Sequence, residues 1–380
     1  MTALPTLARV DLPALTEAVA DTAAEYDRSG AFPADALAAV HRAGVFQAVI
    51  GARLGGGEID ALQRLRVLQA IGRGDPSVAL IVANTLATHV AQIDRDVWPS
   101  HLYAEVVAES AHRPVCINTA RAEPELGAPA RGGLPATVLR RTADGWTVTG
   151  RKSYVTASTG LDYHLVWART DDAQPRVGHL IVRGDAPGIT IVPTWDHLGL
   201  RASCTHDVVY DAVTAPEDHF LEIPYTGVYR DPASQAGALG LTHAALYVGV
   251  ARAAQDFFTR FTHERVPAAL GRPIATTERI QAVAGEIEAQ LVLAETLLYG
   301  VTERAVAGDA AAVAEVPLAK VLVVRSAIAA VEAAVAALGN PALSRSNPLE
   351  RHLRDVLSAR VHPPQEDAAL LAAGRRVLGT

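Results

Sequence analysis

This chain of 380 residues lacks several features that would assign it to a protein class at once. Its two cysteines, Cys116 and Cys204, are too few for a disulfide scaffold or a cysteine metal cluster. It has no basic surplus, because the net charge is −7, so we expect no nucleic-acid partner. The hydrophobic and charged fractions, 49% and 20%, are ordinary for a globular protein and exclude wholesale disorder.

An uninterrupted apolar run of membrane-spanning length is also missing. The apolar stretch from Val316 to Leu338 contains Lys320, Arg325 and Glu332, so no stretch of about 20 residues predicts a membrane span. The N-terminal residues show no charged-then-apolar signal pattern. The sequence therefore predicts a soluble, cytoplasmic protein with no membrane partner.

Short motifs that would name a chemistry are absent as well. The glycines at 55–57 lack the spacing of a dinucleotide or phosphate loop and are expected to form a turn. There is no G-x-S-x-G elbow, which leaves a hydrolase without support. None of the 13 histidines forms an H-x-x-x-H pair and no C-x-x-C occurs, so we predict no metal site.

Periodicity divides the chain into three parts. Residues 1–114 are predicted to be helical, with a helix start at Asp11 and Pro13. Residues 115–228 show short alternating runs separated by Gly, Pro and Asp, which predict a β domain of about six to eight strands. Residues 229–380 carry apolar stripes at helical spacing, typical of a bundle. The expected fold class is α+β: an N-terminal α-helical domain, a middle β domain and a C-terminal four-helix bundle.

Five segments in this order resemble the acyl-CoA dehydrogenase superfamily of flavoproteins, and the resemblance covers nearly the whole chain. They are Ala122–Gly127, Gly150–Thr156, Leu198–Ser203, Glu264–Gln281 and Arg351–Pro364, which are similar to the family's T-E-P-x-A-G, G-x-K-x-[WY]-[IV]-T, G-x-R-x-[ST], R-x-x-F-G-x-x-I with a downstream Gln, and its C-terminal R-D motif. The resemblance implies an acyl-CoA dehydrogenase-like fold and a bound flavin.

The resemblance also implies a set of flavin-binding residues. Tyr154 would lie against the flavin ring and Thr156 near its N5, although both are also ordinary strand residues. Ala122 replaces the family threonine, and Asn118 is a substitute for its hydrogen bond. Arg265 would meet the flavin pyrophosphate across a subunit interface, unless it is a solvated surface charge. The remaining residues of the implied site are Ser203, Arg272 as a second candidate arginine, Gln281 and Gly339.

The C-terminal motif departs from that of the dehydrogenases. Eight residues after Asp355, where these enzymes commonly carry the catalytic glutamate, stands Pro363, which cannot remove a proton. The motif resembles instead that of the group D flavin monooxygenases of the dibenzothiophene monooxygenase type. His362 matches their histidine, with a helix-initiating surface histidine as the alternative interpretation. His89 is the candidate for their second histidine, with a satisfied buried histidine as the alternative.

The sequence thus favours a flavin-dependent monooxygenase. In such an enzyme reduced flavin, FAD or FMN, supplied by a flavin reductase, reacts with O2 through a C4a-hydroperoxide to oxygenate carbon, nitrogen or sulfur of a small organic substrate. One alternative is an acyl-CoA or acyl-carrier dehydrogenase or oxidase with a relocated base, for which Asp256 and Glu264 are nearby acids. Another is a catalytically silent scaffold. We expect a homo-oligomer, a dimer of dimers, because relatives are tetramers.

Overall fold

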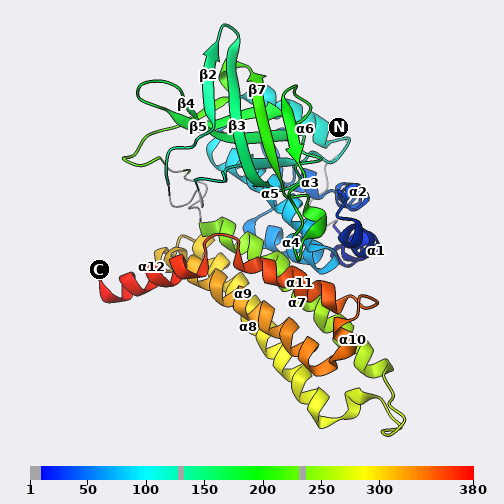
Figure 1. Cartoon of the computed structure of the whole chain (residues 1–380). Coiled ribbons are helices and arrows are strands. Elements are labelled where there is room, and N and C mark those ends of the chain that lie inside the picture. The colour runs from blue at the N-terminus through cyan, green and yellow to red at the C-terminus, as the bar shows by residue number, and fades with distance from the viewer. Residues whose placement is uncertain (1–9, 127–131, 230, 232–236) are drawn as a thin grey trace.

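The computed structural model of the chain describes residues 10–126, 132–229, 231 and 237–380. An N-terminal group of helices comes first, followed by a β domain and then by a long helical bundle that extends away from it (Figure 1). The N-terminal helices are α1 (Leu12–Ser29), α2 (Ala34–Arg42), α3 (Val45–Ala48), η2 (Ala52–Leu54), α4 (Ala61–Gly74), α5 (Pro76–Arg95) and α6 (Ser100–Ser110).

Side-chain caps fix where several of these helices begin. The Asp11 carboxylate accepts a hydrogen bond from the backbone N–H of Ala14, so α1 begins where the sequence predicts. Asp75 caps α5 in the same way through the N–H of Ser77. By contrast, α6 begins after Pro99 and has no side-chain cap.

The middle of the chain forms one eight-stranded sheet, within the predicted number of strands. Its order is β6-β7-β3-β2-β4-β5-β8, with β1 added to β4 in parallel. The strands are β1 (Ile117–Ala120), β2 (Val138–Thr142), β3 (Gly145–Val155), β4 (Tyr163–Thr170), β5 (Val177–Arg183), β6 (Ile189–Val192), β7 (His206–Ala215) and β8 (Phe220–Ile223), with the short turns η4 (Arg201–Ser203) and η5 (Glu217–His219). The β2–β3 hairpin points away from the helices, so the end of β3 faces them (Figure 1).

The C-terminal domain forms the predicted helical bundle, in which three helices are long. They are α7 (Gly237–Glu264), α8 (Glu278–Val306) and α9 (Ala310–Leu338). The shorter helices α11 and α12 pack on α9, and α11 also packs on α7, so together they fill the fourth position. The remaining elements are η7 (Ile274–Thr276), α10 (Asn340–Leu343), α11 (Leu349–Leu357), η8 (Ser358–Arg360) and α12 (Glu366–Leu378).

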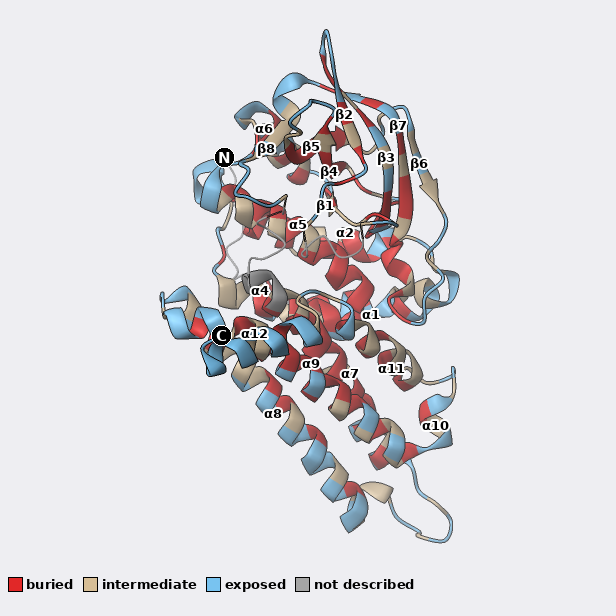
Figure 2. Cartoon of the chain, turned by 60° about the vertical axis from the view of Figure 1, so that its left-hand side comes forward, coloured by how far each residue is buried: buried red, intermediate tan, exposed pale blue. Residues whose placement is uncertain are grey.

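One large apolar core runs through all three parts of the chain, and a smaller second core lies under α6. Figure 2 shows buried residues concentrated where the N-terminal helices, the sheet and the upper bundle meet, whereas the far end of the bundle is mostly exposed. The second core joins α6 to the sheet through Leu102, Tyr103, Tyr163 and Ile181. The three parts are therefore packed against one another as one folded unit.

Two helices, α5 and α9, are long and apolar enough to cross a membrane by length and composition. Most of each apolar window is buried inside the fold, 72% in α5 and 56% in α9. Burial of this kind is typical of core helices, and α9 also carries the buried side chain of Lys320.

Candidate functional site

The end of β3 holds an exposed aromatic ring on a strained backbone. Tyr154 has a φ of +56° and its side chain is 63% exposed. A left-handed conformation at a tyrosine costs of order 1–3 kcal/mol and marks positions with a functional constraint. The pairing of β3 with β7 shifts register between Lys152 and Val155, and this bulge turns the ring outward. His197 packs edge-on against Tyr154, with ring centroids 6.1 Å apart.

Buried hydroxyl groups lie next to the same end of β3. The Thr205 hydroxyl donates to Thr156 Oγ1 at 3.1 Å and lies 2.8 Å from the hydroxyl of Ser203. Asn118 donates from Nδ2 to the Thr156 carbonyl at 3.0 Å. All four side chains are less than 10% exposed. The structure thus brings together the predicted residues of the first three motifs and adds Thr205, which the sequence analysis missed.

Ala122 also belongs to this group, through its backbone. Its carbonyl accepts a hydrogen bond from the N–H of Ser153 at 2.9 Å, beside Tyr154. Its methyl group supplies no hydroxyl where the family motif has threonine. Asn118 is engaged by the Thr156 carbonyl rather than directed at that position.

His362 lies in the connection between α11 and α12, at the end of the bundle nearest the β domain (Figure 1). Its Nε2 is 2.6 Å from the Tyr247 hydroxyl, and its ring stacks on that of His243 with centroids 5.1 Å apart. Burial, and secondarily the charges of His243 and Lys320, hold the pKa of His362 well below its usual value. Because burial also raises the pKa of Tyr247, both groups are neutral at pH 7.

Lys320 on α9 fixes the chain that carries His362. Its Nζ donates to the carbonyls of Ala359, His362 and Pro364, at 3.2, 2.8 and 3.3 Å. Its side chain is almost fully buried, and burial lowers its pKa to about 8. One ammonium group therefore satisfies three carbonyls of an irregular segment and holds the imidazole in place. No local sequence pattern signals this role, except that a lysine interrupts an apolar stripe.

His89 is fully buried in α5. Its Nδ1 lies 2.8 Å from the Tyr103 hydroxyl, while its Nε2 is buried without a hydrogen-bond partner among the described residues. Burial lowers the pKa of His89 to about 4. It is therefore a neutral core histidine with a hydrogen bond at one ring nitrogen, and no contact among the described residues joins it to His362.

The other predicted flavin-binding residues lie at the far end of the bundle. Arg265 follows α7, Arg272 lies in the next loop, Gln281 begins α8 and Gly339 ends α9 with a φ of +65°. All four are exposed. Figure 1 places this end of the bundle away from the β domain, so within one chain these residues are not brought to Tyr154 and Thr156.

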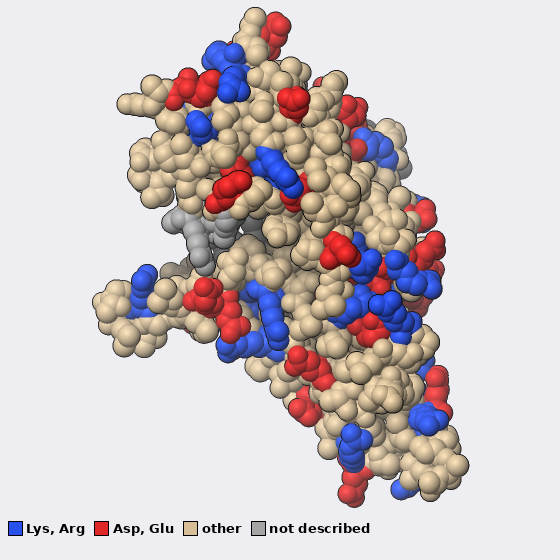
Figure 3. Space-filling model, viewed as in Figure 1, with Lys and Arg blue, Asp and Glu red and all other residues tan. Residues whose placement is uncertain are grey.

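The third and fifth motifs meet at a junction of all three domains, which the sequence analysis did not foresee. Asp355 accepts a hydrogen bond from the N–H of Leu200 at 2.8 Å. Arg354 donates to the Leu198 carbonyl and pairs with Asp27 on α1, at 2.9 and 2.7 Å. A Cβ at Gly199 would lie 2.3 Å from the Arg354 carbonyl, so the backbones touch here. Figure 3 shows acidic and basic side chains crowded together in this region, where α1 meets α11.

Asp256 and Glu264, the two acids considered as relocated bases, both lie on α7. Asp256 pairs with Arg73 at 2.5 Å and lines a cavity of about 680 Å³ between α1, α4, α7 and α11. Glu264 is the exposed last residue of α7.

Comparison with known proteins defines the family. The N-terminal, middle and C-terminal domain models of acyl-CoA dehydrogenase match residues 14–95, 118–213 and 241–364. A Bacillus subtilis (strain 168) protein described as putative acyl-CoA dehydrogenase YdbM is 32% identical over 354 residues, 92% of this chain and 91% of that protein. The chain belongs to the acyl-CoA dehydrogenase family. It is an enzyme of the flavin-dependent oxidoreductase class.

Other relatives have names that indicate a chemistry other than acyl-CoA dehydrogenation. L-evernosamine nitrososynthase of Micromonospora is 29% identical over 348 residues, 88% of this chain and 80% of that protein. The solved structure of KijD3 in complex with FMN and a dTDP-amino-keto sugar has a TM-score of 0.84 at 26% identity, covering 98% of this chain and 93% of KijD3. FMN-bound TdsC from Paenibacillus has a TM-score of 0.85 at 20% identity, covering 98% of each chain, and shares the fold.

Proposed function

We propose that this acyl-CoA dehydrogenase family member is a flavin-dependent monooxygenase that oxygenates an amine-bearing small molecule. The observation that carries the proposal is the pair formed by His362 and Tyr247, next to Pro363 where a catalytic glutamate would be expected. Among the described residues, the groups in contact with the His362 ring are not carboxylates. A proton on carbon therefore has no base there, whereas a neutral imidazole is available as a hydrogen-bond partner.

The exposed Tyr154 ring and the buried hydroxyls at the same end of β3 fit a flat, polar cofactor. An aromatic face at a strained position offers stacking area, and Thr156 offers a hydroxyl close by. A bound flavin would supply two-electron chemistry, accepting hydride when oxidised and reacting with O2 when reduced. FMN is the favoured form, because KijD3 is described with FMN and the candidate adenine contacts lie at the far end of the bundle.

The chain's own residues would control the proton and the water in this site. Since His362 is neutral at pH 7, we assign it a hydrogen-bonding role rather than that of a cationic acid, which the sequence analysis had left open. Tyr247 holds the imidazole at Nε2, and Lys320 holds its backbone. Lys320 is thus a positioning residue that acts through His362.

A second candidate function is an acyl-CoA dehydrogenase with a relocated base. The observation that favours it is the 32% identity to a putative acyl-CoA dehydrogenase over 92% of the chain. Against it, Asp256 is held by Arg73 in the other cavity, and Glu264 ends α7 away from the β domain. A catalytically silent scaffold is the third candidate, which the same measurements distinguish.

The decisive experiment follows the oxidation of protein-bound reduced FMN by air in a stopped-flow instrument, with hydrogen peroxide release measured in parallel. We expect the wild-type protein to slow peroxide release at least about tenfold relative to free reduced FMN. His362→Ala should abolish most of this delay, and Lys320→Met should reduce it, because each removes or releases the imidazole. His263→Ala, an exposed histidine on α7, is the matched control and should behave as the wild type.

Other outcomes identify the alternatives. Anaerobic bleaching of the oxidised, flavin-loaded protein by butyryl-CoA would show a dehydrogenase and reject the monooxygenase. Absence of flavin binding would show a silent scaffold. If His362→Ala delayed peroxide release as well as the wild type, the role of His362 would be wrong. We further propose a cytoplasmic homotetramer served by a separate flavin reductase, to be checked by light scattering and by reconstitution with a purified reductase.

A further inference from the structure

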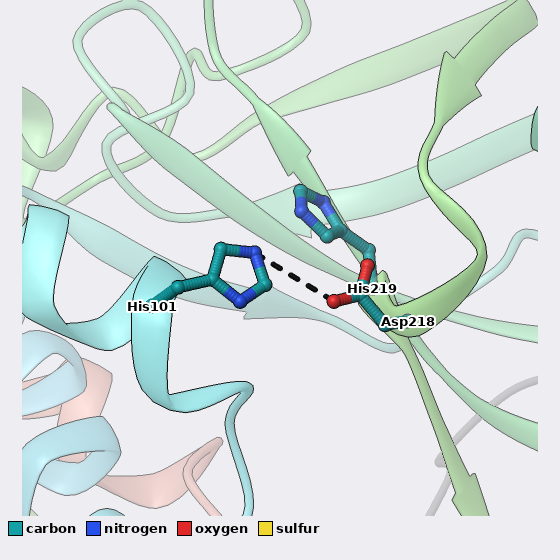
Figure 4. Close-up of side chains that lie close together, drawn as sticks. All are labelled: His101, Asp218 and His219. Atoms are coloured by element: carbon teal, nitrogen blue, oxygen red, sulfur yellow. Dashed lines mark ion pairs between the residues drawn. The ribbon is translucent and has the colours of Figure 1, made fainter.

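Two histidines and an aspartate converge at the edge of the sheet although they are far apart in sequence. His101 lies in the first turn of α6, while Asp218 and His219 lie on η5 (Figure 4). One nitrogen or oxygen of each side chain lies within 4.8 Å of the others. His101 Nε2 and an Asp218 carboxylate oxygen are 3.6 Å apart. Imidazole and carboxylate are the donor types that zinc takes in proteins.

The orientation of His219 suits a metal ligand. Its Nδ1 lies 3.1 Å from the carbonyl of Ile181. Because a carbonyl only accepts, this contact places the imidazole proton on Nδ1 and leaves the lone pair on Nε2. Metal-bound histidines almost always donate their second ring nitrogen to such a group. The carbonyl belongs to β5, a central part of the second core, so the ring is held by rigid structure.

The position of the cluster indicates a structural role for a bound metal ion. The C-terminal end of α6 is fastened to the sheet by Glu109 with Arg183 at 2.7 Å, and Arg113, just beyond the helix, pairs with Asp162 at 2.5 Å. The N-terminal end has no side-chain cap and no acidic residue in its first turn. A cation held by His101 and by η5 would add a polar tie at this end, where Leu102 and Tyr103 already pack in the second core.

We propose that His101, Asp218 and His219 form an exchangeable zinc site that clips α6 to the β domain. With metal–ligand bonds of about 2.1 Å, tetrahedral ligands lie about 3.4 Å apart, so the observed spacing needs only small side-chain rotations. Both His101 and Asp218 are more than half exposed, which leaves access for the ion and room for water at the fourth position. This site is separate from the proposed flavin site and does not depend on it.

The test is a titration of the full-length protein with Zn²⁺ alone, by calorimetry against a weakly chelating buffer. We expect one saturable equivalent per chain. His219→Ala and Asp218→Asn should each weaken zinc binding at least about tenfold. His112→Ala, an exposed histidine just beyond the same helix, is the matched control and should bind as the wild type. Circular dichroism of the metal-free variants verifies folding, and Asp218→Asn preserves side-chain shape.

Hydrogen exchange gives a second, local readout. Zinc should slow exchange of the amides in the first two turns of α6 in the wild type and in His112→Ala, but not in His219→Ala. If zinc binding is unsaturable, or is equal in His219→Ala and the wild type, the proposal is overturned. The three residues then form only a surface ion pair in which Asp218 faces the positive end of the α6 dipole.

Discussion

The two ends of the C-terminal bundle differ in how far their polar side chains find partners within one chain. At the end nearest the β domain, Lys320, Asp355 and His362 are held by named hydrogen bonds from several elements. At the far end, Arg265 and Arg272 are exposed and make no ion pair among the described residues. His362 at the near end and Arg265 and Arg272 at the far end were predicted to serve one flavin site, yet only His362 is held in place by contacts within a single chain.

This difference separates the part of the candidate site that a single chain positions from the part that we expect to need a second chain. Buried, cross-linked polar groups keep their geometry without a ligand, because moving any of them leaves another unsatisfied. Exposed arginines acquire a defined place only when a second surface meets them. The near end is thus a rigid half-site, and the far end is a surface that we expect a second copy of the chain to use.

The largest expected effect comes from breaking the near end at Arg354. Its guanidinium pairs with Asp27 and Glu350, each at 2.7 Å, and all three side chains are less than one-fifth exposed. Arg354→Ala leaves two carboxylates without their cation and releases the Leu198 carbonyl. We expect a loss of about 3 kcal/mol in the free energy of unfolding. Urea denaturation at pH 7 measures it.

Arg345→Ala serves as the control for this change. Arg345 is exposed in the loop before α11, and its removal should alter the free energy of unfolding by less than about 0.5 kcal/mol. Equal stability of the Arg354 and Arg345 variants would mean that the three-domain junction does not stabilise the fold, and the contrast between the two ends would lose its basis.

A smaller and pH-dependent effect is expected at Asp355. Burial raises the pKa of Asp355 to about 7, against which the hydrogen bond from Leu200 acts. Between about pH 4 and 7 the unfolded chain loses this proton while the folded chain keeps it, so stability falls as pH rises, by up to about 1.4 kcal/mol per pH unit. Above pH 7 the difference stays constant. Asp355→Asn removes this dependence.

The measurement compares wild type and Asp355→Asn by urea denaturation at pH 5, 6, 7 and 8. The free energy of unfolding of the wild type should decline relative to that of the variant up to pH 7 and then run parallel to it. Parallel curves over the whole range would show that Asp355 titrates at its ordinary value, and that the near end is more hydrated than its geometry implies.

Much of the fold could be predicted because it depends on local rules. Helix starts at Asp11 and Asp75 follow from side-chain capping, and the stop at Gly339 follows from a glycine with positive φ. Strand alternation located the sheet and its approximate strand number. The uneven fourth position of the bundle was not predictable, because it depends on which helices pack on α9 rather than on the pattern of any one helix.

The candidate site was predictable only where a motif carried it. Tyr154 and Thr156 lie together because they share one strand end, but Thr205 joins them through a sheet pairing that no spacing encodes. Asp355 stood in the recognised motif, yet its contact with Leu200 crosses 155 residues. The predicted absence of a metal site rested on local spacing, and the fold brings His101 to η5 by the same long-range packing.

The smallest stability effect, and the sharpest separation of the two ends, is expected for Arg265→Ala. Because Arg265 is exposed, its removal should change the free energy of unfolding by less than about 0.5 kcal/mol. If a second chain brings Arg265 to the flavin phosphate, the same variant should bind FMN about tenfold more weakly, since a charge-assisted pair is lost. Titration of flavin fluorescence measures this loss, with Arg279→Ala, exposed at the start of α8, as control. A variant that loses stability but binds FMN as the wild type would make Arg265 a structural residue of its own chain, and the far end would then resemble the near one.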